Sequence, residues 1–127
     1  MIPIENLPVV DLLSAFEEVT EYWSPKVVAR VNDQYVKLAK LKGEFTWHSH
    51  EHEDEMFFVV RGQLDIQYEG GRVVSLNSGA LHVVPRGVLH NPFAEQECWI
   101  MLIETVTTLH TGILDTPYTI CIAQQLA

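Results

Sequence analysis

The stretch from residue 43 to residue 62 constrains the fold of this chain more than any other part of the sequence. One apolar segment, 34–41, precedes it, and another, 56–60, follows a short acidic turn, so both are predicted to be β-strands. Between them lie His48 and His50, separated by one residue in an extended segment. Because the side chains of a strand alternate between its faces, these two imidazoles are predicted to point the same way.

Glu55 follows the polar turn and begins the returning strand. A hairpin of this kind brings Glu55 onto the same inner surface as His48 and His50. Two neutral imidazoles and a carboxylate are a common ligand set for a divalent transition metal. The alternative is a solvated acidic loop, but apolar strands flank the cluster on both sides, which favours a metal site.

A second segment, 79–92, adds another histidine to this set. It contains a predicted strand over 80–84 and a tight bend marked by Pro85 and Gly87. His90 follows the bend directly, where a neighbouring strand can deliver it as a fourth ligand.

Together the two segments resemble the two conserved motifs of the cupin superfamily. In the first motif, a His-x-His pair is followed by a glutamate and then, after six residues, by a glycine; the matching residues are His48, His50, Glu55 and Gly62. In the second, a glycine is followed by Pro-x-Gly and then by a histidine; the matching residues are Gly79, Pro85, Gly87 and His90.

Two positions depart from the family pattern. Gly43 lies one residue closer to His48 than is usual, and Ala94 stands where the second motif ends in asparagine, with Asn91 beside the histidine instead. Neither departure affects a predicted ligand. The resemblance therefore still implies a metal site, but the chain after His90 is predicted to follow a different path from the usual one.

The resemblance implies an all-β fold: a jelly-roll β-barrel (double-stranded β-helix) of the RmlC-like type. It also implies one divalent transition metal bound by His48, His50, Glu55 and His90. Fe, Mn, Ni, Co and Zn all accept such mixed ligands, so the sequence does not choose among them. The implied function is action on a small oxygenated molecule, as a dioxygenase or as an isomerase or lyase of the sugar-isomerase-like cupins. The alternative is a non-catalytic cupin that binds or senses a small ligand.

The rest of the chain independently predicts a sandwich or barrel, because it contains many short strands at close spacing. The further predicted strands are 26–31, 63–69, 72–76 and 98–104. Apolar residues at helical spacing predict a short helix within 7–19. The segment 105–117 is predicted to be a surface connection, and 118–123 a last strand or a tail packed on the barrel.

The length of 127 residues fits one domain. We expect its conserved barrel at about 26–105, an N-terminal arm with the helix at 1–25, and a C-terminal extension at 106–127. The net charge of −9 argues against nucleic-acid and anionic membrane partners. The N-terminus lacks the pattern of a signal peptide, so a cytoplasmic location is expected, with Cys98 and Cys121 as reduced core residues.

Other polar residues near the motifs have two interpretations each. His52 would become a ligand only in a shifted register that puts an apolar residue where the carboxylate is required, so it is predicted to be exposed. His82 is either an ordinary strand histidine or an acid–base group near the metal. His110 either caps the pocket mouth or is a solvated loop residue, and Arg86 is either a rim charge or a contact for an anionic substrate.

Alternation from an inward-facing Glu55 also predicts an apolar outer face. Its members are Trp47, Met56, Phe58 and Val60. A face of this kind needs cover, and a second copy related by two-fold symmetry supplies it, so a homodimer is predicted. Partial cover by the N-terminal segment is the alternative.

Overall fold

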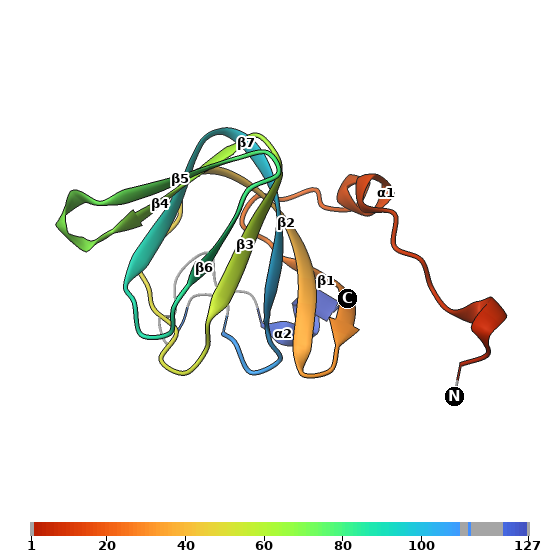
Figure 1. The fold of residues 1–127 in the computed structure, drawn as a ribbon. Helices are drawn as coiled ribbons and strands as arrows, with labels where there is room; N and C mark the ends of the chain where they lie inside the picture. Colours follow the sequence, from red (N-terminus) through yellow and green to blue (C-terminus); the bar gives the residue numbers. More distant parts are fainter. Residues whose placement is uncertain (1, 110–111, 113–120, 127) are drawn as a thin grey trace.

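A computed structural model describes residues 2–109, 112 and 121–126. Strands are the main regular structure in this part of the chain (Figure 1); they are β1 (Lys26–Val31), β2 (Gln34–Glu44), β3 (Glu55–Arg61), β4 (Gln63–Tyr68), β5 (Val73–Asn77), β6 (Leu81–Val84) and β7 (His90–Thr105). The helical elements are brief and lie outside or between the strands; they are η1 (Ile4–Asn6), α1 (Leu12–Glu17), η2 (Glu69–Gly71) and α2 (Ile122–Leu126).

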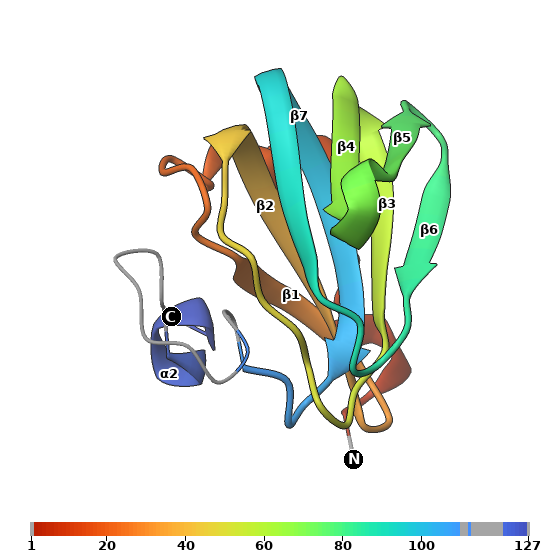
Figure 2. The same ribbon diagram turned by 90° about the vertical axis from the view of Figure 1, so that its left-hand side faces the viewer.

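Strand β7 holds the barrel together because it pairs with three other strands. Its first residues pair with β4, its later residues pair with β3, and β2 runs antiparallel along most of its length. The resulting order is β1-β2-β7-β3-β6, with β4 joining β7 to β5. Figure 2 shows β7 between β1 and β2 on one side and β3 to β6 on the other. This antiparallel jelly roll with a short N-terminal helix confirms the predicted fold class.

The barrel interior is filled by alternate residues of each strand. Leu64, Ile66, Val59 and Ile100 are almost completely buried in one apolar cluster. In the strand predicted over 63–69, Tyr68 also packs against this cluster. The barrel core is therefore built by the period-two pattern of the sequence.

Helix α1 covers one end of the outer face of the sheet. Asp11 begins it, because its carboxylate accepts hydrogen bonds from both the backbone N–H and the hydroxyl of Ser14. Phe16 is fully buried against Leu38, and its ring stacks on Trp99 with the ring centroids 4.8 Å apart. The N-terminal segment thus covers part of the face predicted for a partner.

Three predicted elements differ from the structure. The helix begins at Leu12 rather than residue 7, because Pro8 disfavours helical backbone at its predecessor and Asp11 provides the cap. Strand β7 begins at His90 rather than 98. Its exposed residues 95–97 fall where the register with β2 shifts, and their polar character hid the strand.

Of the two alternatives predicted for 118–123, the last strand is wrong for Ile122 and Ala123, which begin helix α2, and the tail packed on the barrel agrees with the contact of α2 with β1. Residues 118–120 lie outside the described part of the chain. Both cysteines are free, as expected, but only Cys98 is buried; Cys121 is exposed and is not a core residue. No helix in the described ranges is long and apolar enough to cross a membrane.

Candidate metal centre

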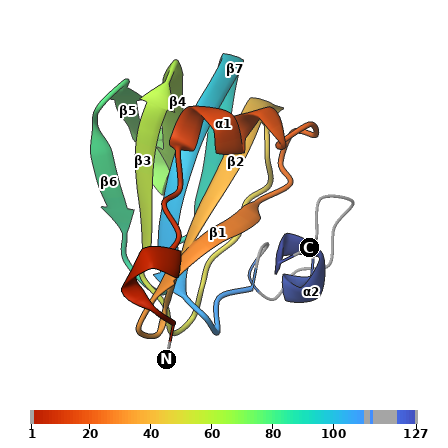
Figure 3. The same cartoon turned by 90° about the vertical axis from the view of Figure 1, so that its right-hand side faces the viewer.

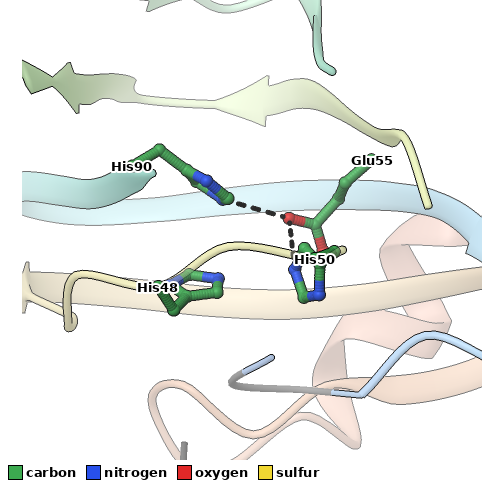
Figure 4. A group of neighbouring side chains, drawn as sticks. All are labelled: His48, His50, Glu55 and His90. Atoms are coloured by element: carbon green, nitrogen blue, oxygen red, sulfur yellow. Dashed lines mark ion pairs between the residues drawn. The ribbon is translucent and has the colours of Figure 1, made fainter. Parts of the chain in front are cut away.

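Four buried polar side chains face one another inside the barrel (Figure 4). His48 and His50 come from the segment between β2 and β3, Glu55 is the first residue of β3, and His90 is the first residue of β7. Each is at most 4% exposed. One nitrogen or oxygen atom from each residue lies within 4.8 Å of the other three. The four residues chosen as ligands from the sequence are therefore brought together in space.

Backbone hydrogen bonds between the two motif segments hold this arrangement. His48 and His90 form an isolated antiparallel bridge, with N–H to carbonyl distances of 3.0 and 2.9 Å. The backbone N–H of Gly87 donates to the carbonyl of His50 at 2.7 Å. The segment carrying His48 and His50 is extended, as predicted, but it is not a continuous strand. It is a loop held by hydrogen bonds to the Pro-x-Gly turn and to β7.

Two of the imidazoles have their orientation fixed by the backbone. His48 Nδ1 lies 2.9 Å from the carbonyl oxygen of Thr46, and His90 Nδ1 lies 2.9 Å from that of Val88. A carbonyl only accepts, so each Nδ1 is the donor, and Nε2 is the atom that the neutral ring can offer to a metal. Histidines that bind metals are commonly held in this way.

The buried ligand atoms fit a metal ion better than they fit one another. Among the described residues, both ring nitrogens of His50, Oε1 of Glu55 and Nε2 of His90 lack a hydrogen-bond partner. Glu55 Oε1 is 3.5 Å from His50 Nε2 and 3.6 Å from His90 Nε2, too far for good hydrogen bonds. Burying such atoms unsatisfied is costly.

The size of the cluster also suits a single ion. Metal–ligand bonds of about 2.0–2.2 Å place ligand atoms up to about 4.4 Å apart across an ion. The observed limit of 4.8 Å requires only a small contraction. The described residues therefore fit one divalent transition metal.

The electrostatics of the site keep His48 in the form that binds metals. Burial, helped by the neighbouring His90, lowers the pKa of His48 to about 4. A neutral imidazole is the ligand form, so His48 needs no deprotonation near neutral pH.

Comparison with known proteins agrees with this geometry. Residues 34–103 match the family model of the cupin domain. This chain belongs to the cupin superfamily. A cupin-2 domain containing protein from Shewanella frigidimarina NCIMB 400 is 41% identical, with a TM-score of 0.74 over 76% of this chain and 94% of that chain.

Two further relatives extend the comparison. Protein NMB1881 from Neisseria meningitidis is 31% identical, with a TM-score of 0.72 over 77% of this chain and 99% of that chain. The uncharacterized protein YdbB of Bacillus subtilis is 34% identical over 80 residues, which are 63% of this chain and 71% of YdbB.

This cupin also contains a buried ion pair behind the candidate ligand Glu55, which was not predicted from the sequence. Lys37 Nζ lies 2.6 Å from Glu104 Oε1, and both side chains are almost fully buried. Glu104 in turn contacts the carboxyl group of Glu55. The signal was available: Lys37 and Glu104 occupy inward positions, and the next inward positions along their strands, Ala39 and Leu102, are apolar.

The pKa values of the two carboxyl groups are shifted in opposite directions. Burial, and then the charge of Glu55, raises the pKa of Glu104 well above its usual range. Burial also opposes ionisation of Glu55, but contacts from Glu104 and two histidines outweigh it and hold the pKa of Glu55 well below its usual range. Of the two carboxyl groups, Glu104 is therefore the one that takes up a proton first as the pH falls, and the candidate ligand Glu55 keeps its charge longer.

His82 points into the barrel of the cupin and has a partner. Its Nε2 lies 2.7 Å from the hydroxyl oxygen of Tyr68, and Tyr68 is the cross-strand neighbour of His90. Burial, and then the nearby His90, lowers the pKa of His82, whereas burial raises the pKa of Tyr68. The tyrosine hydroxyl and the imidazole thus share a hydrogen bond beside the cluster.

His52 and Arg86 are exposed rather than part of the cluster. The His52 side chain is 78% exposed, as predicted. Arg86 is exposed on the turn, and its backbone N–H donates to Asp54 at 2.8 Å. His110 lies outside the described residues.

A small apolar cavity adjoins the cluster. It has a volume of about 30 Å³, and its walls include His48, Glu55, Trp23, Phe45 and Phe57. This is room for about two water molecules. Any substrate bound in this conformation therefore places only a small group beside the ligands.

Within the described residues, Gly112 of the C-terminal chain contacts the loop that carries His48 and His50. Gly112 packs so closely against the backbone of Ser49, between His48 and His50, that a Cβ at position 112 would overlap the Ser49 carbonyl oxygen. Its φ of +65° also favours glycine. Gly112 therefore supports, at Ser49, the loop that carries two candidate ligands.

Proposed function

We propose that this cupin binds one divalent transition metal through His48, His50, Glu55 and His90 and acts on a small oxygenated molecule. The observation that carries the proposal is the group of buried ligand atoms without hydrogen-bond partners among the described residues. When bound, an ion with these ligands supplies a Lewis acid that polarises the oxygen atoms of a substrate. The identity of the metal is left open by the ligand set.

The residues around the cluster have separate tasks in this proposal. The apolar walls, including Phe45 and Phe57, exclude water from the substrate. Tyr68 Oη and His82 Nε2 hold a proton between them beside His90 and move it to or from the substrate. Lys37 and Glu104 keep the Glu55 carboxylate in place.

The Tyr68–His82 pair favours one of the two enzyme classes. An isomerase or lyase that acts next to a carbonyl must move a proton, and this pair provides an acid and a base within 2.7 Å of each other. A dioxygenase instead needs a redox-active metal, and the protein residues give no preference for one. We therefore propose the isomerase or lyase class first and the dioxygenase second.

Metal analysis of protein purified without a histidine tag is the first test. We expect about one equivalent of a divalent transition metal, and its loss in a variant carrying His48→Ala and His90→Ala. Stoichiometric metal retained by the double variant would place the site elsewhere.

Proton exchange is the second test. In D₂O, with small sugars and hydroxy or keto acids, we expect NMR to show deuterium entering a substrate carbon next to the carbonyl. Tyr68→Phe should abolish this exchange but leave the metal bound, whereas Tyr22→Phe, an exposed tyrosine, should not change it. Oxygen consumption without exchange would favour the dioxygenase, and metal binding without either would favour a ligand-binding or sensor protein.

Two further parts of the proposal concern the state of the protein. We propose that it is a homodimer, because apolar side chains remain on the outer face of the sheet. The cytoplasmic location stays a prediction from the sequence.

A further inference from the structure

The segment before helix α1 exposes large apolar side chains. This arm, residues 2–11, contains Ile4 at 85% exposure and Val9 at 93% exposure, and Ile2 and Leu7 are more than half exposed. Figure 1 shows the arm leaving the body of the molecule at α1 and standing clear of the sheet. Figure 3, which views the same arm from the side, shows it in front of the outer face of the sheet. The arm therefore overhangs this face without packing on it.

The face below the arm is itself apolar. On β3, Met56 and Phe58 point outward, and their cross-strand neighbours extend the surface; these are Leu81 and Val83 on β6 and Met101 and Ile103 on β7. Leu81 is 57% exposed and Val83 is 44% exposed. We call Met56, Phe58, Leu81, Val83 and Ile103 the outer apolar face.

The cover that α1 gives stops short of this face. Phe16 of α1 and Val19, which follows the helix, pack on Leu38, Val60 and Met101, at one end of the sheet. Trp47, which the sequence grouped with Met56 and Phe58, lies elsewhere, in a groove with Leu89 and the β4–β5 turn. The surface left for a partner is thus narrower than the sequence predicted and lies beside the arm.

We propose that two copies of this chain exchange their arms, each arm packing on the outer apolar face of the other copy. The arm does not pack on the sheet of its own chain, so its apolar side chains need another apolar surface. The outer apolar face in turn needs an apolar cover. In a dimer with two-fold symmetry, each arm covers the outer apolar face of the other copy through the same residues. This symmetry is closed, so no further copies are added. The inference is independent of the metal site and gives the proposed homodimer a specific interface.

Arm variants test the exchange first, by light scattering and sedimentation at micromolar concentration. Wild type is expected to be a dimer. Replacing both Ile4 and Val9 by Glu should raise the dissociation constant at least tenfold, and metal content and circular dichroism should stay unchanged because neither side chain packs on its own barrel. A monomeric wild type, or an unaltered dissociation constant in the arm variant, would overturn the proposal.

The sheet side has a matched pair of variants. Val83→Lys changes the outer apolar face, whereas Val73→Lys changes a valine of similar exposure, 53%, on β5. We expect only Val83→Lys to weaken the dimer. Equal effects from both variants would exclude the outer apolar face as the interface.

Cross-linking separates exchange from folding back. In a Cys121→Ser background, Ile4→Cys and Val83→Cys are combined and treated with a short bismaleimide. Exchange gives a covalent dimer on a denaturing gel. A cross-link within one chain, which leaves a monomer band, would show that the arm folds onto its own sheet and would overturn the proposal.

Discussion

Lys37 and Glu104 form an ion pair, 2.6 Å from Nζ to Oε1, in the interior of the barrel and directly behind the candidate ligand Glu55. Lys37 is the cross-strand neighbour of Leu102, and Glu104 is that of Glu55, so β2, β7 and β3 each supply one charged residue to the row. A buried cation beside two carboxyl groups fixes the position of Glu55 and limits the negative charge of the site. The ion pair thus connects the barrel core to the candidate metal centre.

Replacing Lys37 by Met tests the role of this pair. The change leaves two buried carboxyl groups without their cation, so we expect the free energy of unfolding of the metal-free protein to fall by about 3–5 kcal/mol. Urea denaturation measures it. Adding Glu104→Gln removes the unpaired charge and should recover most of the loss. A double variant as unstable as the sum of the two single variants would show that the residues do not interact.

Removing one candidate ligand should affect metal binding more than folding. His90→Ala should lower metal affinity by more than about 100-fold, because even residues that only support ligands commonly contribute about 10–100-fold. The apolar core stays intact, so the variant should still give the β-sheet circular dichroism of wild type. Competition with a chelator measures the affinity.

His52→Ala is the matched control for that experiment. His52 lies two residues after His50 but is 78% exposed. We expect its removal to leave the affinity within about twofold, as for a surface substitution. A larger loss from His52→Ala than from His90→Ala would mean that the ligand set uses the shifted register.

The sequence predicted the barrel well because its strands alternate regularly and its turns contain glycine. It also identified the four clustered residues, since each lies in a short motif. It did not reveal Lys37 and Glu104, which belong to the same site but come from strands far apart in the chain. Only the register of β2, β7 and β3 shows that these charges meet at Glu55.

The starts of helix α1 and strand β7 were harder to predict, for a different reason. Val9, Leu12, Leu13 and Phe16 have helical spacing, but Pro8 and the cap at Asp11 begin the helix only at Leu12 and leave Val9 exposed. The polar residues 95–97 interrupt the apolar pattern, so the first half of β7 was not predicted. The strand continues through them because its register with β2 shifts there. In both places, a local backbone feature overrode the pattern of side chains.

Gly62, which ends the first motif, should not tolerate a larger residue. Its φ is +95°, and an added Cβ would lie 2.9 Å from the Glu97 carbonyl oxygen. We expect Gly62→Ala to lower the free energy of unfolding by about 3 kcal/mol, from backbone strain and overlap together. Gly79→Ala is the control, because its φ is +87° with no atom within 4 Å of the added Cβ. It should cost about 1–2 kcal/mol, from strain alone.

The metal-free protein should lose stability in mild acid because of His48. Its pKa is about 4 in the folded protein, against 6.5 for an ordinary histidine. Between these values the unfolded chain binds a proton that the folded protein does not, so stability falls as the pH falls from about 6.5 to about 4. A shift of this size corresponds to about 3 kcal/mol.

Urea denaturation in the presence of a chelator, at pH 7 and at pH 4, measures this loss. Carboxylates elsewhere in the chain also titrate in this range, so the test is the difference between wild type and His48→Gln. Glutamine does not titrate, so the variant should lose about 3 kcal/mol less than wild type between the two pH values. An equal loss in both proteins would show that His48 is not held neutral by its burial beside His90.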